Sequence, residues 1–232
     1  MHDPISQRSP TPERDYCEIL RGSLLVLAAS LAIIAICYFW IDRPVDFYVH
    51  DQAIEKIRVF KWLTFPPPLL EDWAPVVLTL LVVRRVRGPF VRWQKLLLVA
   101  CLSLVVADNF RTSLGELLGR YWPETWFDDN PSLIGNGTYG FHPFQWGDDT
   151  GSFPSGHAAR ILGFASVWWL AMPKSRAICV LVCLPMLVSL IAMDYHFVSD
   201  VVAGSTLGAI VGAYATRLAK LRSCQEVCGE AG

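Results

Sequence analysis

The sequence has no excess of charge of either sign. Its 20 lysines and arginines nearly balance 21 aspartates and glutamates, which gives a formal net charge of −1 at pH 7. Proteins that bind nucleic acid through electrostatics carry an excess of basic charge. The composition therefore gives no reason to expect a nucleic-acid partner.

Cysteine is not placed where disulfides would be expected. The seven cysteines fall within apolar runs or in the two terminal segments, so no disulfide framework is implied. A signal-peptide cleavage site is also missing, because Trp40-Ile41-Asp42-Arg43-Pro44 has no small-x-small pattern after the first apolar run. We expect that run to be retained.

What the sequence has in abundance is long apolar runs, typical of integral membrane proteins. We predict an all-α, six-transmembrane helix bundle, although several runs are shorter than the roughly 20 residues that cross a bilayer. The predicted spans are Leu24–Ile41, 73–86, Leu96–Phe110, Ala158–Met172, Ala177–Met193 and Val201–Leu218. The expected division is an N-terminal tail over 1–22, a membrane domain over 23–220 and a C-terminal tail over 221–232.

Basic residues predict the orientation of this bundle. With six spans, the segments around Arg14 and Arg21, 84–95, 174–176 and 217–222 fall on one face, which the positive-inside rule makes cytoplasmic. Both termini are then cytoplasmic. The opposite face receives a long aromatic-rich outside loop over 111–155, between the third and fourth spans. Loops of this length are often lids or binding loops, and its aromatic rings suit the bilayer interface.

Two histidines begin predicted spans on that outside face. His196 is followed four residues later by Asp200, a spacing that puts both on one helix face and within hydrogen-bonding reach. A carboxylate on one imidazole nitrogen would leave the other free to attack. The spacing alone is equally typical of a helix cap.

The second histidine lies in Ser155-Gly156-His157, a turn that leads into a helix. Backbone N–H groups at a helix N-terminus bind anions, Ser155 adds a hydroxyl, and Gly156 lets an oxyanion approach closely. His157 is a candidate proton donor to a leaving oxygen. Arg120 offers a planar fork for phosphate oxygens, or alternatively contacts lipid headgroups.

At these residues the chain resembles the type 2 phosphatidic acid phosphatase (PAP2) superfamily. That family's pattern is Lys-x6-Arg-Pro, then Pro-Ser-Gly-His, then Ser-Arg-x5-His-x3-Asp. Here Pro154-Ser155-Gly156-His157 completes the second motif, and His196 with Asp200 completes the end of the third. The resemblance runs from about residue 96 to 212.

The resemblance implies a metal-independent membrane phosphatase with no cofactor. His196 would attack phosphorus, Asp200 would orient it, and His157 would protonate the leaving group. Ser155, Gly156 and basic side chains would hold the phosphoryl oxygens. Expected substrates are lipid phosphates in the bilayer: undecaprenyl diphosphate, phosphatidylglycerol phosphate, phosphatidic acid or lipid A phosphate. The compact size fits a bacterial inner membrane, with the active site on the periplasmic face.

Three cationic positions of the family pattern are changed in this chain. Gly115 and Trp122 occupy the lysine and arginine positions of the first motif, and Leu190 follows Ser189 where an arginine is expected. A transferring phosphoryl group needs positive charge around it. We therefore predict that Arg120 is the main phosphate ligand, assisted by Arg160 or Arg111.

Four other interpretations remain open from the sequence. The chain is a lipid phosphotransferase if another acceptor replaces water, or an inactive headgroup-binding protein if the lost cations matter. An intramembrane serine protease would use Ser155 and a histidine. A metal site from His157, His196, Asp200 and Asp148 has no ligand spacing that demands it.

Overall fold

The computed structural model describes residues 12–126, 129–144 and 150–221. The outer part of each expected tail and Asp148 of the alternative metal site lie outside these residues. Within them the chain is all-helical, as predicted, with isolated bridges in place of strands. The helices are α1 (Pro12–Ile36), a π-helical segment (Cys37–Ile41), α2 (Asp42–Asp51), α3 (Arg58–Leu63), α4 (Pro66–Val86), α5 (Arg92–Leu118), α6 (Leu133–Asn136), α7 (Gly156–Ala171), α8 (Arg176–Ala192) and α9 (Val198–Leu218).

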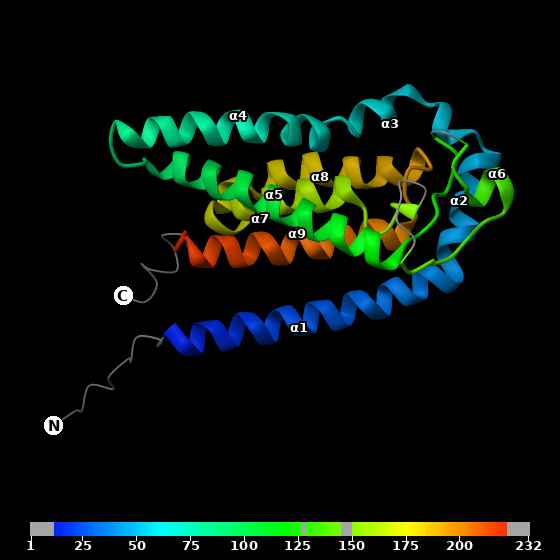
Figure 1. Cartoon of the computed structure of the whole chain (residues 1–232), viewed down its shortest axis with the longest axis horizontal. Helices are drawn as coiled ribbons and strands as arrows, with labels where there is room; N and C mark the ends of the chain where they lie inside the picture. Colours follow the sequence, from blue (N-terminus) through cyan, green and yellow to red (C-terminus); the bar gives the residue numbers. More distant parts are fainter. Residues whose placement is uncertain (1–11, 127–128, 145–149, 222–232) are drawn as a thin grey trace.

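Four helical segments of the described chain are long and apolar enough to cross a membrane. They are Ile19–Asp51, Arg92–Leu118, Pro173–Ala192 and Val198–Leu218. The beginning of α1 and the end of α9 lie at the same end of the bundle, and α2 and α6 lie at the other (Figure 1). Many of their large apolar side chains face outward, Leu24 and Leu181 among them, as expected for surfaces in contact with lipid.

Helix α7 lies between α5 and α9, and small residues bring it close to α9. A Cβ atom at Gly204 or Gly208 would collide with the backbone oxygen of Ser155 or Ala159, respectively. Three glycines at four-residue spacing give α9 one narrow face, so the two backbones can approach. This contact fixes the beginning of α7 against the beginning of α9, where the two histidine motifs are.

Several predicted boundaries move in the structure. Helix α5 continues to Leu118, so Arg111 lies on a helix rather than in the outside loop. Helix α4 begins at Pro66, because proline is tolerated in a first helical turn. Helix α1 begins at Pro12, so half of the expected N-terminal tail is helical.

Candidate active site

A cavity of about 370 Å³ lies where α5, α7 and the α8–α9 turn meet. It contains both motif histidines, two arginines and three aromatic residues. The lining residues are Arg111, Trp122, Trp126, His157, Arg160, Tyr195 and His196. The fold therefore brings together residues that are up to 85 positions apart in the sequence, from Arg111 to His196.

His196 lies in the turn before α9 and is 3 % exposed. Its Nδ1 is 3.0 Å from the backbone oxygen of Ser152. Because a carbonyl oxygen only accepts hydrogen bonds, Nδ1 carries the proton and the Nε2 lone pair is free. Burial lowers the pKa of His196 below its usual value, which favours the neutral ring. His196 is thus held in the tautomer that a nucleophile needs.

Asp200 does not bond His196 directly, in contrast to the reach expected from the spacing. Its Oδ2 is 3.9 Å from His196 Nδ1. That oxygen instead accepts from Ser152 Oγ at 2.6 Å and from the backbone N–H of Phe197 at 3.1 Å. The reason is that α9 begins at Val198, so His196 precedes the helix and helical i, i+4 geometry does not apply. Asp200 therefore reaches His196 through Ser152.

His157 is the second residue of α7, and its ring centroid lies 6.0 Å from that of His196. Ser155 is the N-cap of the helix: its hydroxyl accepts from Ala158 N at 3.4 Å, and the residue is fully buried. Ser155 is not among the residues that line the cavity. His157 and His196 thus line the same cavity, while Ser155 caps the N-terminus of α7.

Arg111 extends from α5 across the beginning of α7. An added Cβ at Gly156 would lie 2.7 Å from Arg111 Nε and 3.1 Å from its Cζ. The buried Nε has no hydrogen-bond partner among the described residues. Buried polar groups are normally hydrogen-bonded, so this unsatisfied donor beside two histidines indicates a place for an anion.

Arg160 also lines the cavity, but two acidic residues already neutralise it. Its Nε donates to Asp108 Oδ1 at 2.7 Å, and its Nη1 is 2.8 Å from Glu71 Oε2. The sequence placed Arg160 on the His157 face of the helix, and the cavity contains both residues. Its side chain is held in a fixed place by these two carboxylates.

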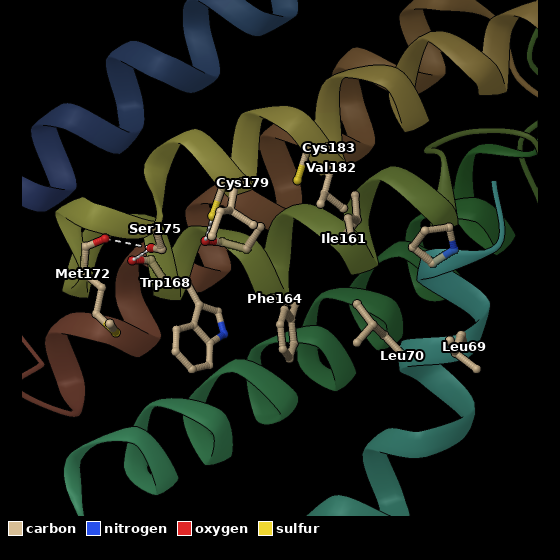
Figure 2. Close-up of a pocket in the computed structure, with 13 residues that line it drawn as sticks. Leu69, Leu70, Ile161, Phe164, Trp168, Met172, Ser175, Cys179, Val182 and Cys183 are labelled. Atoms are coloured by element: carbon tan, nitrogen blue, oxygen red, sulfur yellow. Dashed lines mark hydrogen bonds between the residues drawn. The ribbon is translucent and has the colours of Figure 1, made fainter. Parts of the chain in front are cut away.

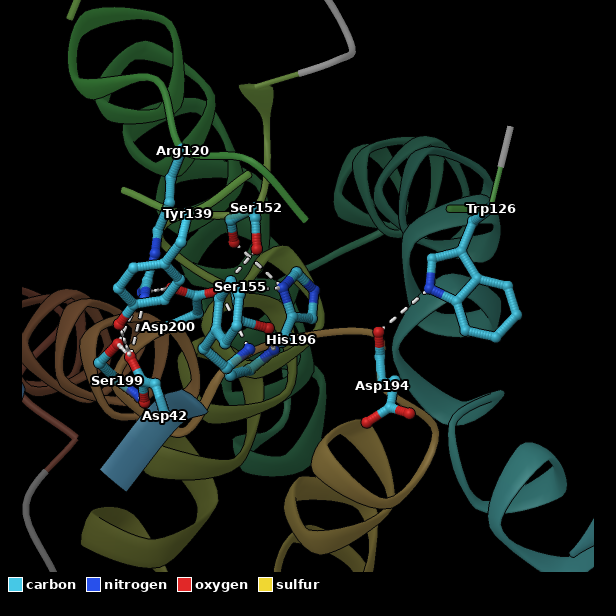
Figure 3. Close-up of polar contacts among 12 residues, drawn as sticks. Asp42, Arg120, Trp126, Tyr139, Ser152, Ser155, Asp194, His196, Ser199 and Asp200 are labelled. Carbon is cyan, nitrogen blue, oxygen red and sulfur yellow. Dashed lines mark hydrogen bonds and ion pairs between the residues drawn. The ribbon is translucent and has the colours of Figure 1, made fainter. Parts of the chain in front are cut away.

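Arg120, the predicted main phosphate ligand, lies elsewhere. It is completely buried and does not line the cavity with the histidines. Its guanidinium donates to Asp42 Oδ2 at 2.8 Å, to Ser199 Oγ at 2.6 Å and to Asp200 Oδ1 (Figure 3). The structure therefore places Arg120 behind Asp200, on the far side from His196.

Comparison with known proteins gives the family of the chain. The family model of the PAP2 superfamily matches residues 96–223, more than half of the chain. The chain belongs to the PAP2 superfamily. No curated protein matches the chain. Among solved structures, a transmembrane PAP2-type phosphatidylglycerolphosphate phosphatase from Bacillus subtilis has a similar fold. The TM-score is 0.51 at 15% sequence identity, with 85% of this chain and 96% of that chain covered.

The PAP2 motif arginine is replaced by Trp122, and this residue enters the site. Its ring centroid lies 5.4 Å from that of His196. Trp126 packs edge-on against Tyr195, and its Nε1 donates to the backbone oxygen of Asp194 at 3.1 Å. Sequence reasoning did not assign these aromatic residues to the site. The only signal was the aromatic richness of the loop, which does not show which rings point inward.

A second, larger cavity of about 550 Å³ runs along the membrane part of the PAP2 fold (Figure 2). It lies between α4, α7 and α8, and apolar residues such as Leu70, Ile161 and Phe164 form its wall. Leu70 and Ile161 are the chain neighbours of Glu71 and Arg160, which form the ion pair beside the histidines. An apolar cavity therefore begins next to the catalytic cavity.

Among the described residues, no three His, Cys, Asp or Glu side chains are grouped so as to hold a metal ion. Four helices of membrane-spanning length and composition, together with a transmembrane neighbour of the same family, support an integral membrane protein.

Proposed function

We propose that the protein is a membrane lipid phosphate or diphosphate phosphatase that works through a phosphohistidine intermediate. The observation that carries this proposal is the buried Arg111 Nε, which has no hydrogen-bond partner among the described residues, beside the cavity that holds His157 and His196. A buried guanidinium nitrogen without an acceptor is costly, and a phosphoryl group would supply that acceptor. In this scheme Arg111 is the main phosphate ligand, and Arg160 assists.

The scheme begins with attack by His196. Its Nε2 lone pair forms a bond to phosphorus, and the bond from phosphorus to the leaving oxygen breaks. His157 protonates that oxygen as it leaves. In the second step water attacks the phosphohistidine, His157 takes a proton from the water, and His196 is released with inorganic phosphate. The hydrogen bond from Nδ1 to Ser152 holds the ring in place throughout.

The apolar cavity supports a lipid as the substrate. A hydrocarbon chain would fill the space between α4, α7 and α8 while its phosphate lay against Arg111. Phosphatidylglycerol phosphate is the first candidate to test, because the Bacillus subtilis neighbour is described as its phosphatase. Undecaprenyl diphosphate, phosphatidic acid and lipid A phosphate are the others.

We further propose six spans, with α4 and α7 added to the four apolar segments. Both pack against α5, with α7 inside the bundle and α4 along its edge (Figure 1). The basic link after α4, the link before α8 and the end of α9 would face the cytoplasm. The catalytic cavity is near the opposite end, which would place it at the periplasmic face of a bacterial inner membrane.

Phosphate release in detergent with excess EDTA tests the proposal on a panel of these four lipids. We expect wild type and the control His50→Ala to release phosphate, and His196→Ala to release none. His50 is a suitable control because it pairs with Glu124 and does not line the cavity. Acid-labile labelled phosphate should be trapped on wild type, not on His196→Ala.

Two results would contradict the proposal. Activity that EDTA abolishes would require a metal, and activity retained by His196→Ala would require another nucleophile. If wild type bound the lipids without releasing phosphate, it would act as a headgroup-binding protein. Transfer of labelled phosphate to an added alcohol would indicate a phosphotransferase.

A further inference from the structure

Behind the catalytic cavity lies a buried polar cluster that joins the first helical segment to the third PAP2 motif. Its members are Asp42, Arg120, Ser199 and Asp200, each at most 1% exposed (Figure 3). Asp42 is the first residue of α2 and directly follows the π-helical segment Cys37–Ile41. It lies outside residues 96–223, which match the family model.

Asp42 uses both carboxylate oxygens to hold this cluster together. Oδ2 accepts from Arg120 Nη2 at 2.8 Å and from the Ser199 hydroxyl. Oδ1 accepts from the backbone N–H of Ser199 at 3.0 Å. Since Ser199 is in the first turn of α9, one carboxylate fixes both the guanidinium and the helix that carries Asp200.

Arg120 then holds Asp200 in a defined orientation. Its Nη1 donates to Asp200 Oδ1, and a planar guanidinium fixes the direction as well as the distance of such contacts. The rings of Tyr38, Phe141 and Phe197 surround the guanidinium, with its Cζ 5.2, 5.1 and 4.2 Å from their centroids. These rings limit the movement of Arg120 if one of its carboxylate partners is removed.

The remaining contacts lead from Asp200 to the nucleophile. Asp200 Oδ2 accepts from Ser152 Oγ at 2.6 Å, and the Ser152 carbonyl accepts from His196 Nδ1 at 3.0 Å. A shift of Asp200 would therefore move Ser152, and with it the acceptor that sets the tautomer and angle of His196. A misplacement of about 1 Å at a reacting group can cost about a hundredfold in rate.

We propose that Asp42 is a positioning residue for the reaction, acting through Arg120, Asp200 and Ser152 on His196. The inference rests on the proposed phosphatase function. It makes the first helical segment part of the catalytic unit and not solely a membrane anchor. Asp42 itself does not touch the cavity, so its loss should change turnover and leave phosphate binding unchanged.

Asp42→Asn tests this directly, with Asp46→Asn as the matched control. Asp46 is one turn further along α2 and is also buried, but it makes no hydrogen bond to Arg120, Ser199 or Asp200 among the described contacts. We expect Asp42→Asn to lower kcat about tenfold or more, because a buried charged hydrogen bond is lost. The KM and the inhibition constant for orthovanadate should stay within about twofold.

Equilibrium dialysis with orthovanadate, a phosphate analogue, counts the intact sites in each preparation. The proposal requires Asp42→Asn to keep a full complement of sites while turnover falls, and Asp46→Asn to keep both. Ser199→Ala is a milder second variant, since it removes one hydroxyl from the cluster. We expect it to lower kcat about threefold with unchanged orthovanadate binding, as for the loss of one modest hydrogen bond.

The outcomes separate this inference from the proposed function. Wild-type turnover in Asp42→Asn, or equal losses of turnover and orthovanadate sites in Asp42→Asn and Asp46→Asn, would overturn the positioning role alone. A wild type that releases no phosphate from any lipid would overturn the proposed function, and the inference with it.

Discussion

The Arg111 guanidinium lies directly over Gly156, with its Nε 2.7 Å from where a Cβ atom at that position would be. The absence of a side chain at Gly156 therefore makes room for the Arg111 guanidinium. In the proposed scheme Arg111, on α5, supplies the positive charge that Trp122 cannot supply at the expected arginine position.

Gly156→Ala should displace Arg111 from the cavity. We expect kcat/KM to fall about tenfold or more, as for the loss of one charged hydrogen bond to phosphate. The control is Gly22→Ala on α1, where an added Cβ meets nothing within 4 Å. It should keep full activity. Equal activity of the two variants would show that Arg111 does not need the space over Gly156.

Arg111→Ala should cost more activity than Arg160→Ala. Among the described residues Arg111 forms no direct ion pair and its Nε has no hydrogen-bond partner, whereas Glu71 and Asp108 pair directly with Arg160. We expect kcat/KM to fall about tenfold to hundredfold for Arg111→Ala. Arg111→Lys should recover part of the lost kcat/KM. Steady-state kinetics on the best lipid substrate measure this, and a larger loss in Arg160→Ala would reverse the assignment.

His157→Ala should lower kcat in a way that depends on the leaving group. A general acid contributes about 10²–10⁴-fold when the departing oxygen is basic. We therefore expect a large loss with an alkyl phosphate and a much smaller one with 4-nitrophenyl phosphate, whose leaving group needs no proton. Losses of the same size with both substrates would mean that His157 does not act as the acid.

Arg120→Ala should mainly destabilise the protein. It would leave the carboxylates of Asp42 and Asp200 buried without their cation, and breaking a buried ion pair in this way costs about 3–5 kcal/mol. Thermal unfolding in detergent should show a clear fall in Tm. A variant that kept the wild-type Tm but bound orthovanadate poorly would restore Arg120 as a phosphate ligand.

Asp194→Asn should stabilise the protein more at pH 8 than at pH 5. Burial, with a contribution from Glu55, raises the pKa of Asp194 to about 7, and the contact with Asp46 only partly offsets this rise. The unfolded carboxyl ionises near pH 3.9, so the unfolded state binds fewer protons between that value and about 7. The Asp194 carboxyl therefore destabilises the folded protein most above pH 7. Tm values of both proteins at the two pH values measure this.

The sequence anticipated the parts of the site that depend on local order. The apolar runs predicted helices, and the Pro-Ser-Gly-His segment predicted a helix N-terminus, which the structure forms with Ser155 as the N-cap. The spacing of His196 and Asp200 was less informative, because the helix begins after the histidine. Helix α9 begins two residues after His196. As a result Asp200 is linked to His196 through hydrogen bonds to Ser152, and not by the direct contact that we expected.

By itself, the sequence determined the all-helical membrane class, the family and the two histidines, because these follow from local hydrophobicity and from residues adjacent in the chain. Only the tertiary structure decided which arginines line the cavity with the histidines. The sequence placed Arg120 ahead of Arg111 and Arg160, but helix packing buries Arg120 behind Asp200 and pairs Arg160 with carboxylates. It leaves the Arg111 Nε without a hydrogen-bond partner among the described residues. The availability of a charge depends on its partners, and those partners come from residues distant in the chain.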